Sequence, residues 1–81
     1  MISCHQHDYI EISCVYRYLI RLTLRSGSKL DGIAIDTQLN DKQEECIKVD
    51  VDGVDQLIVL DSIHKMEVLT ENPHFNQVIF D

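Results

Sequence analysis

With 81 residues the chain has the length of a single domain, and its apolar fraction of 44% is too high for a disordered protein. Fourteen acidic and seven basic side chains give a formal charge of −7, which opposes binding to a nucleic-acid backbone unless the few cations gather in one place. The sequence has no long apolar run and no basic-then-apolar leader. We therefore expect no membrane span, no secretory signal and a cytoplasmic location.

Residues 8–16 carry the apolar spacing of a short helix. Apolar residues recur there every three or four positions, at Tyr9, Ile10, Ile12, Cys14 and Tyr16. Asp8 and Glu11 fall on the other side of the helical wheel, one turn apart, and acidic residues in a first turn suit the helix dipole. We expect an N-terminal helix with an acidic outer face, held by packing because it is short.

From residue 17 the pattern changes to a period of two. One set of alternate positions is apolar, Tyr18, Ile20, Leu22 and Leu24, and the other holds Arg17, Leu19, Arg21, Thr23 and Arg25. The arginines at a spacing of four would also fit a helical stripe, but the turn that follows favours a strand. This alternation predicts a strand with one basic face over residues 17–25. A turn at residues 26–28 and a second apolar run at residues 29–36 predict a hairpin, in which Gly32 indicates a bulge or a bend.

Residues 36–45 form a polar stretch that predicts a loop. Two apolar runs follow, residues 46–51 and 54–61, joined by Asp52-Gly53. An Asp-Gly pair readily takes the positive φ angles of a tight turn, so this is the clearest hairpin signal in the chain.

The C-terminal part adds one or two closing strands, residues 62–69 and 74–80. The fold class is therefore mostly β with one N-terminal α-helix, in a single domain of residues 1–81. Because an open sheet leaves two exposed edges, we expect the strands to curl into a small half-open, Sm-like, five-stranded antiparallel barrel over residues 17–80, capped by the helix. OB-type barrels have the same size, but a helix before the first strand favours the Sm-like order.

A metal site near the N-terminus is one alternative, because Cys4, His5, His7 and Cys14 are all ligand types. Structural zinc sites usually show two close ligand pairs, whereas this is one cluster, so we expect no metal and interpret Cys14 as a core residue. A Cys4–Cys14 disulfide is not expected, because three cysteines without a secretory signal indicate reduced thiols.

Catalysis and RNA binding are two further alternatives. No nucleophile motif surrounds the cysteines or histidines, and the isolated glycines form no phosphate-binding loop, so we expect neither an enzyme nor a cofactor. An Sm-like RNA-binding module would use the strip Arg17, Arg21 and Arg25, with Tyr16 or Tyr18 stacking on a base. If the chain does not bind RNA, these arginines are expected to pair with the surplus carboxylates on neighbouring strands.

A protein-binding module is the remaining interpretation. Asp8 and Glu11 are placed to face one basic groove together, and the polar loop at residues 36–45 offers a second exposed surface. The simpler alternative is a solvated helix face and a solvated loop.

The order of several motifs resembles the Rof (YaeO) family, the Rho-binding antiterminators of bacteria. The similarity runs over residues 2–65, through Ile2-x-Cys4, Asp8-x-x-Glu11-x-x-Cys14, "LTLRSGSKLDGIAID" and "IVLDSI". The resemblance implies an Sm-like fold that does not act on RNA itself. It implies binding to the transcription termination factor Rho and obstruction of its primary RNA-binding site, an OB-fold domain. We expect no membrane or direct nucleic-acid partner, and a monomer when free.

Carried over position by position, the resemblance implies a Rho-binding set of His7, Asp8, Glu11, Asn40, Lys42 and Gln43. Asp8 and Glu11 match the family's acidic helix positions and are expected to contact arginine or lysine on Rho. The loop after the second strand is the family's other contact region. It is more basic in other members, whereas here Lys42 is its one cation. His7 stands where an aromatic or acidic residue is expected, and is a candidate to stack on or hydrogen-bond to the partner.

Overall fold

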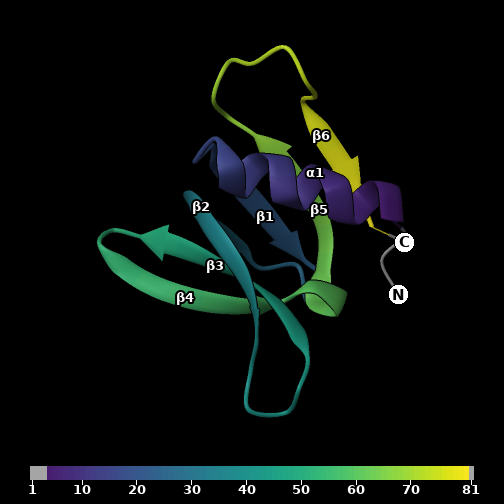
Figure 1. Cartoon of the computed structure of the whole chain (residues 1–81), viewed down its shortest axis with the longest axis vertical. Helices are drawn as coiled ribbons and strands as arrows, with labels where there is room; N and C mark the ends of the chain where they lie inside the picture. Colours follow the sequence, from purple (N-terminus) through teal and green to yellow (C-terminus); the bar gives the residue numbers. More distant parts are fainter. Residues whose placement is uncertain (1–3, 81) are drawn as a thin grey trace.

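The computed structural model describes residues 4–80; residues 1–3 and 81, Ile2 of the first motif among them, lie outside this description. One helix precedes six strands and a 3-10 turn (Figure 1). In chain order the elements are α1 (Cys4–Val15), β1 (Leu19–Leu24), β2 (Lys29–Leu39), β3 (Glu45–Val51), β4 (Val54–Val59), η1 (Leu60–Ser62), β5 (Ile63–Val68) and β6 (Gln77–Ile79). The expected class, mostly β with an N-terminal helix, is confirmed. Within residues 4–80 no helix has the length and apolarity needed to cross a membrane.

Helix α1 is one turn longer than its apolar spacing predicts, because it begins at Cys4. The added turn is stabilised by polar contacts to the sheet. Gln6 Nε2 donates to the Ile79 carbonyl at 2.9 Å, and the His7 ring lies 3.0 Å from a Glu45 carboxylate oxygen. Tertiary contacts such as these supply most of the stability of a short helix. Both partners are distant in the sequence, so the apolar spacing of the helix gives no sign of them.

The helix ends in a Schellman motif, and this removes Arg17 from the strand predicted to contain it. Arg17 has a φ of 53°, in the left-handed region. The Tyr18 N–H donates to the Ser13 carbonyl at 3.0 Å, and the Arg17 N–H to the Cys14 carbonyl at 3.2 Å. These two bonds satisfy carbonyls that the helix end would leave unpaired. The predicted strand start at residue 17 is therefore wrong, and β1 begins at Leu19.

The strands form one antiparallel sheet in the order β4-β3-β2-β1-β5-β6. The predicted count of five strands is too low, because the last segment adds the short strand β6. The sheet curls beside α1 (Figure 1), and β4 and β6 stay at its two ends, so the described strands form an open sheet and the predicted half-open barrel is not confirmed in full. The turn η1 separates β4 from β5, and β5 pairs with β1.

Strand β2 continues to Leu39, so the loop predicted at residues 36–45 shrinks to residues 40–44. The irregularity predicted at Gly32 lies further along, where the β2–β3 register shifts between Ala34 and Asp36. Gly32 instead permits close approach of β3. A Cβ atom there would lie 2.5 Å from the Val49 side chain and 2.6 Å from the Asp50 carbonyl oxygen. Only glycine fits such a contact without backbone movement.

The hairpin predicted at Asp52-Gly53 is confirmed. Both residues have positive φ angles, 53° and 87°, and the strands β3 and β4 pair directly across the turn. The Gly53 N–H also donates to the Asp50 side chain at 2.8 Å. Local turn chemistry was sufficient here, because both central residues tolerate the required conformation.

The core lies between α1 and the face of the sheet that it covers. It consists of Ile10, Cys14, Tyr18, Ile20, Leu22, Ala34, Ile47, Val49, Leu60, Ile63, Met66, Val78 and Phe80. The buried stripe of the helix is narrower than predicted, because Tyr9 on α1 and Tyr16 just beyond its end are 36% and 57% exposed. Their rings pack at the rim, Tyr9 on Phe75 and Tyr16 on His74, with ring centroids 4.7 and 5.2 Å apart.

Candidate protein-binding site

The polar face of α1 carries two carboxylates in different states. Asp8 is exposed and makes no ion pair or side-chain hydrogen bond with any residue of the described chain. Glu11 is also exposed, but its carboxylate lies 3.2 Å from Nδ1 of His7, one turn earlier. The helix therefore presents one unpaired carboxylate and one that is held by a histidine.

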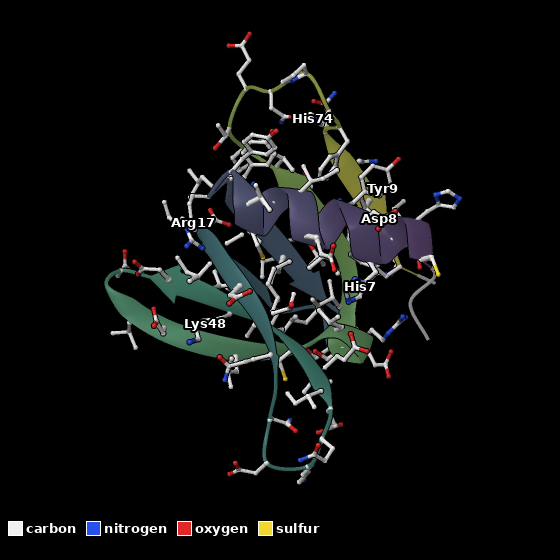
Figure 2. All side chains as sticks on the ribbon, viewed as in Figure 1. His7, Asp8, Tyr9, Arg17, Lys48 and His74 are labelled. Carbon is white, nitrogen blue, oxygen red and sulfur yellow. The ribbon has the colours of Figure 1, made fainter. Side chains whose placement is uncertain are left out.

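His7 joins this helix face to the sheet. Its side chain is 32% exposed, and Nε2 lies 3.0 Å from the Glu45 carboxylate at the start of β3. An imidazole ring with a proton on both nitrogens donates to Glu11 and Glu45 at once. Figure 2 shows His7 and Tyr9 extending from opposite sides of α1, with His7 on the side of β3 and Tyr9 on the side of β6.

The loop at residues 40–44 has an internal frame built on Asn40. The Asn40 side-chain oxygen accepts from the backbone N–H groups of Lys42 and Glu44 at 2.9 and 3.0 Å, and its Nδ2 donates to the Glu44 carboxylate at 3.0 Å. Gln43 has a φ of 64° and donates its N–H to the Asn40 carbonyl. Asn40 therefore shapes the loop, while the side chains of Lys42 and Gln43 are exposed.

Two shallow pockets meet at His7. One, of about 300 Å³, is lined by His7, Gln43, Glu44, Glu45, Val59, Leu60 and Asp61. The other, of about 350 Å³, is lined by His7, Thr37, Gln38, Leu39 and Glu45. The structure thus brings the helix residue His7 and the loop residue Gln43 to one pocket.

Sequence reasoning missed Glu45, which links the two predicted regions. The sequence indicates its position but not its role. Cys46 and Ile47 are apolar, so the residue before them ends a polar loop at the start of a strand. A glutamate at such a position is ordinary, and only the fold shows that the helix passes beside it.

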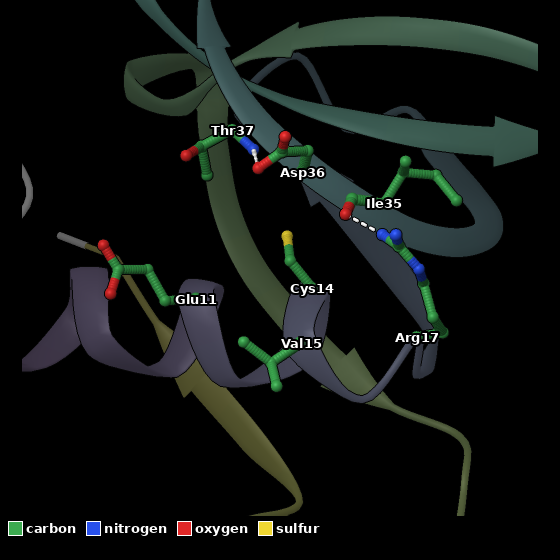
Figure 3. Close-up of a pocket in the computed structure, with 7 residues that line it drawn as sticks. All are labelled: Glu11, Cys14, Val15, Arg17, Ile35, Asp36 and Thr37. Carbon is green, nitrogen blue, oxygen red and sulfur yellow. Dashed lines mark hydrogen bonds between the residues drawn. The ribbon is translucent and has the colours of Figure 1, made fainter.

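A third pocket, of about 380 Å³, lies between α1 and β2 and is lined by Glu11, Cys14, Val15, Arg17, Ile35, Asp36 and Thr37 (Figure 3). At one end of this pocket the Arg17 guanidinium donates to the Ile35 carbonyl. Burial, and to a smaller extent the Asp36 carboxylate, raise the pKa of the Cys14 thiol to about 11. Cys14 is therefore protonated at neutral pH, which suits a core residue and not a nucleophile or a metal ligand.

The N-terminal cluster of cysteines and histidines does not converge on one point. Cys4 is exposed and Cys14 is buried, and their positions on one helix separate them by about 15 Å along its axis. A disulfide needs Cα atoms within roughly 7 Å, so this pair cannot form one while the helix persists. Within residues 4–80 no group of three or more histidine, cysteine or acidic residues is arranged to hold a metal ion.

The predicted arginine strip is divided by the fold. Arg17 lies at the helix end, and Arg21 on β1 donates to both carboxylate oxygens of Asp31 at 2.8 and 3.0 Å. This pairing raises the pKa of Arg21 and lowers the pKa of Asp31 from their ordinary values. Arg25 donates to the carbonyls of Asp61 and Phe80 at 2.8 and 2.6 Å. Each guanidinium therefore has a partner within the chain.

Comparisons with known proteins agree with the architecture. A family model described as "Modulator of Rho-dependent transcription termination (ROF)" matches residues 1–80. A search of curated proteins found no significant match. A solved structure, described as YaeO bound to magnesium from Vibrio cholerae O395, shares 38% sequence identity and a TM-score of 0.89, and the match covers 94% of this chain and 99% of that one. The family description is regulatory and names no enzymatic reaction. The chain therefore belongs to the ROF family of modulators of Rho-dependent transcription termination.

Proposed function

We propose that this protein inhibits Rho-dependent termination by binding the N-terminal OB-fold domain of Rho and obstructing its primary RNA-binding site. The observation that carries the proposal is the Glu11–His7–Glu45 contact, which holds the acidic face of α1 beside the base of the β2–β3 loop. This contact supports a single interface built from the two regions that the family resemblance implicates.

The chemistry of the target supports an acidic binder. A groove for single-stranded RNA is basic and lined with aromatic side chains. The unpaired carboxylate of Asp8 is exposed on a helix whose other side is packed in the core. Such a carboxylate can take the place of an RNA phosphate at an arginine or lysine without first breaking an internal ion pair. The net charge of −7 would also steer association with a basic surface.

The six residues of the proposed interface have different roles. Asp8 and Glu11 contact basic side chains of Rho, and Lys42 and Gln43 contact it from the loop. Asn40 supports the interface indirectly, because its side chain is committed to the frame of the loop. His7 lies between the two regions and positions both.

The proposal needs no cofactor and no direct contact with RNA. It places the protein in the cytoplasm, where Rho meets nascent transcripts, and treats it as a monomer before it binds. It also accounts for the arginines Arg17, Arg21 and Arg25, whose partners lie within the chain and which are not required for the interface.

A competition experiment tests the proposal. Fluorescent oligo(C) RNA is bound to purified Rho, and the protein is titrated in while fluorescence anisotropy is followed, with a parallel titration that lacks Rho. We expect anisotropy to fall only when Rho is present. A rise in anisotropy without Rho would instead show direct RNA binding, and no change in either titration would contradict obstruction of the primary site.

A further inference from the structure

The contact between His7 and Glu45 spans 38 residues of sequence and joins two elements that nothing else in the sequence pattern connects. On the helix side, His7 also lies against Glu11, so the imidazole stands between two carboxylates. On the sheet side, Glu45 is the first residue of β3 and directly follows the loop. Movement of Glu45 relative to His7 would therefore change how the loop is placed beside α1.

The loop at residues 40–44 is held together by hydrogen bonds within itself. Besides the side-chain bonds of Asn40, the Asn40 N–H donates to the Glu44 carbonyl and the Gln43 N–H to the Asn40 carbonyl, both at 3.0 Å. This network closes the loop upon itself, so its orientation is set where it joins β2 and β3. Glu45 occupies one of those two junctions.

Two other polar contacts, one at each end of the helix in the described part of the chain, lead elsewhere. Gln6 donates to the carbonyl of Ile79 near the end of β6, and Arg17 donates to the carbonyl of Ile35 on β2 at the opposite end of the helix. These contacts fix the helix on the sheet, but they do not reach the base of the loop. The carboxylate of Glu45 does, and it is 61% exposed at a surface that a partner would cover.

We infer that Glu45 is a positioning residue for Rho binding, acting through His7 to hold the acidic helix face and the β2–β3 loop in one arrangement. This inference rests on the proposed function and deepens it. Glu45 is assigned no contact with Rho of its own. Its effect on affinity therefore exists only while His7 is present to receive it.

A double-mutant cycle tests this role. The variants are Glu45→Gln, His7→Ala and their combination, and Rho affinity is measured for each by displacement of labelled oligo(C). We expect Glu45→Gln alone to weaken binding by about three- to tenfold, the size typical of coupled neighbours. In the His7→Ala background the same substitution is expected to be silent. Additive losses would overturn the inference, because they would show that Glu45 contacts Rho directly.

Glu71→Gln is the matched control. Glu71 is exposed on the segment between β5 and β6, and its replacement removes the same charge far from the loop. We expect it to leave affinity unchanged within about twofold. A loss equal to that of Glu45→Gln would mean that net charge alone is responsible, which would also overturn the inference.

A measurement on the free protein separates this inference from the proposed function. In ¹H–¹⁵N spectra, Glu45→Gln is expected to shift the amide signals of both the loop at residues 40–44 and the N-terminal half of α1, whereas Glu71→Gln is not. Unchanged signals in α1 would overturn the inferred link from Glu45 to the helix, whatever the Rho affinity, because the loop amides next to residue 45 shift with any substitution there. If Glu45→Gln shifts the α1 signals but the wild-type protein does not bind Rho, the proposed function fails. The role of Glu45 in Rho binding then fails with it.

Discussion

The two sides of α1 are attached to the sheet by different forces. Toward β3 the helix is held by an imidazole between two carboxylates that remain partly exposed. Toward the segment between β5 and β6 it is held by rings, with Tyr9 against Phe75, and Tyr16 stacked between Tyr18 and His74. Ring packing excludes water and does not depend on charge, whereas exposed ion pairs exchange readily with water or with another charged group.

This difference indicates that the two sides of α1 have different roles, one in stability and one in binding. The aromatic side contributes mainly to the stability of the fold, because its contacts need no outside partner. The polar side contributes little to stability, since exposed ion pairs are worth about 0–1 kcal/mol. It is nevertheless the side with unpaired or exchangeable carboxylates, and is therefore the side suited to bind. Four predictions test this contrast.

The largest effect is expected from charge reversal on the polar side. Asp8→Lys and Glu11→Lys should each weaken Rho binding by roughly 2–5 kcal/mol, since a desolvated charge on Rho would lose its partner and meet a like charge. The thermal midpoint should stay near that of the wild-type protein, because both positions are exposed. Affinity is measured by competition and stability by circular dichroism. Wild-type affinity in both variants would refute the assignment of this helix face.

On the aromatic side a substitution is expected to lower stability and leave Rho affinity unchanged. Phe75→Ala should destabilise the fold by about 2 kcal/mol, because it removes a half-buried ring and its contact with Tyr9. In a domain of this size such a loss lowers the thermal midpoint by roughly 8–16 °C. Rho affinity at a temperature where the variant is folded should change little. A large loss of affinity with unchanged stability would reverse the roles of the two sides.

Added salt should weaken Rho binding, which depends on the polar side of α1, without weakening the fold, which depends on the aromatic side. Raising the salt concentration from about 0.05 to about 0.5 M shortens the screening length to a few ångströms, so Rho affinity should fall by about tenfold or more. The thermal midpoint should not fall in parallel, because the aromatic contacts and the core are not screened. Titrations at several salt concentrations provide the check, and an affinity independent of salt would point to an apolar interface.

The smallest effect concerns the Arg21–Asp31 pair, which lies on neither side of α1 and serves as a reference. The pKa of Asp31 is lowered in the folded protein, chiefly by its hydrogen bond to Arg21. The stabilisation from this pair is therefore complete above the ordinary pKa of 3.8 and is lost as pH falls through the lower folded value. Asp31→Asn should flatten the acid limb of a stability curve slightly and leave Rho affinity unchanged. An unchanged acid limb would show that the pair is not formed in solution.

Several features could be predicted because their causes lie close together in the chain. The Asp52-Gly53 hairpin follows from two residues that tolerate positive φ, and the paired runs beside it alternate as strands do. The helix was predicted from the spacing of Ile10 and Cys14, which are buried as expected. The helix boundaries were less accurate, because the first turn depends on contacts of Gln6 and His7 with the sheet, and Arg17 on cap geometry, and apolar spacing encodes neither.

The candidate site was predicted in pieces and not as a whole. Asp8 and Glu11 were placed on one exposed helix face, and their spacing alone supports this. The loop at residues 40–44 was identified as polar, but the frame that Asn40 builds within it was not. The link through Glu45 could not be predicted, because an exposed glutamate at a strand start has no distinctive pattern.

The amino-acid sequence by itself determined the fold class, the hairpins, the acidic helix face and the resemblance to a family, because each depends on residues a few positions apart or on motifs in order. Only the tertiary structure decided that the sheet stays open, that Arg17 leaves the strand, and that His7 meets Glu45 across 38 residues. Such contacts depend on how the whole core packs. Local propensities act over a few residues and do not specify which distant surfaces the packing brings together.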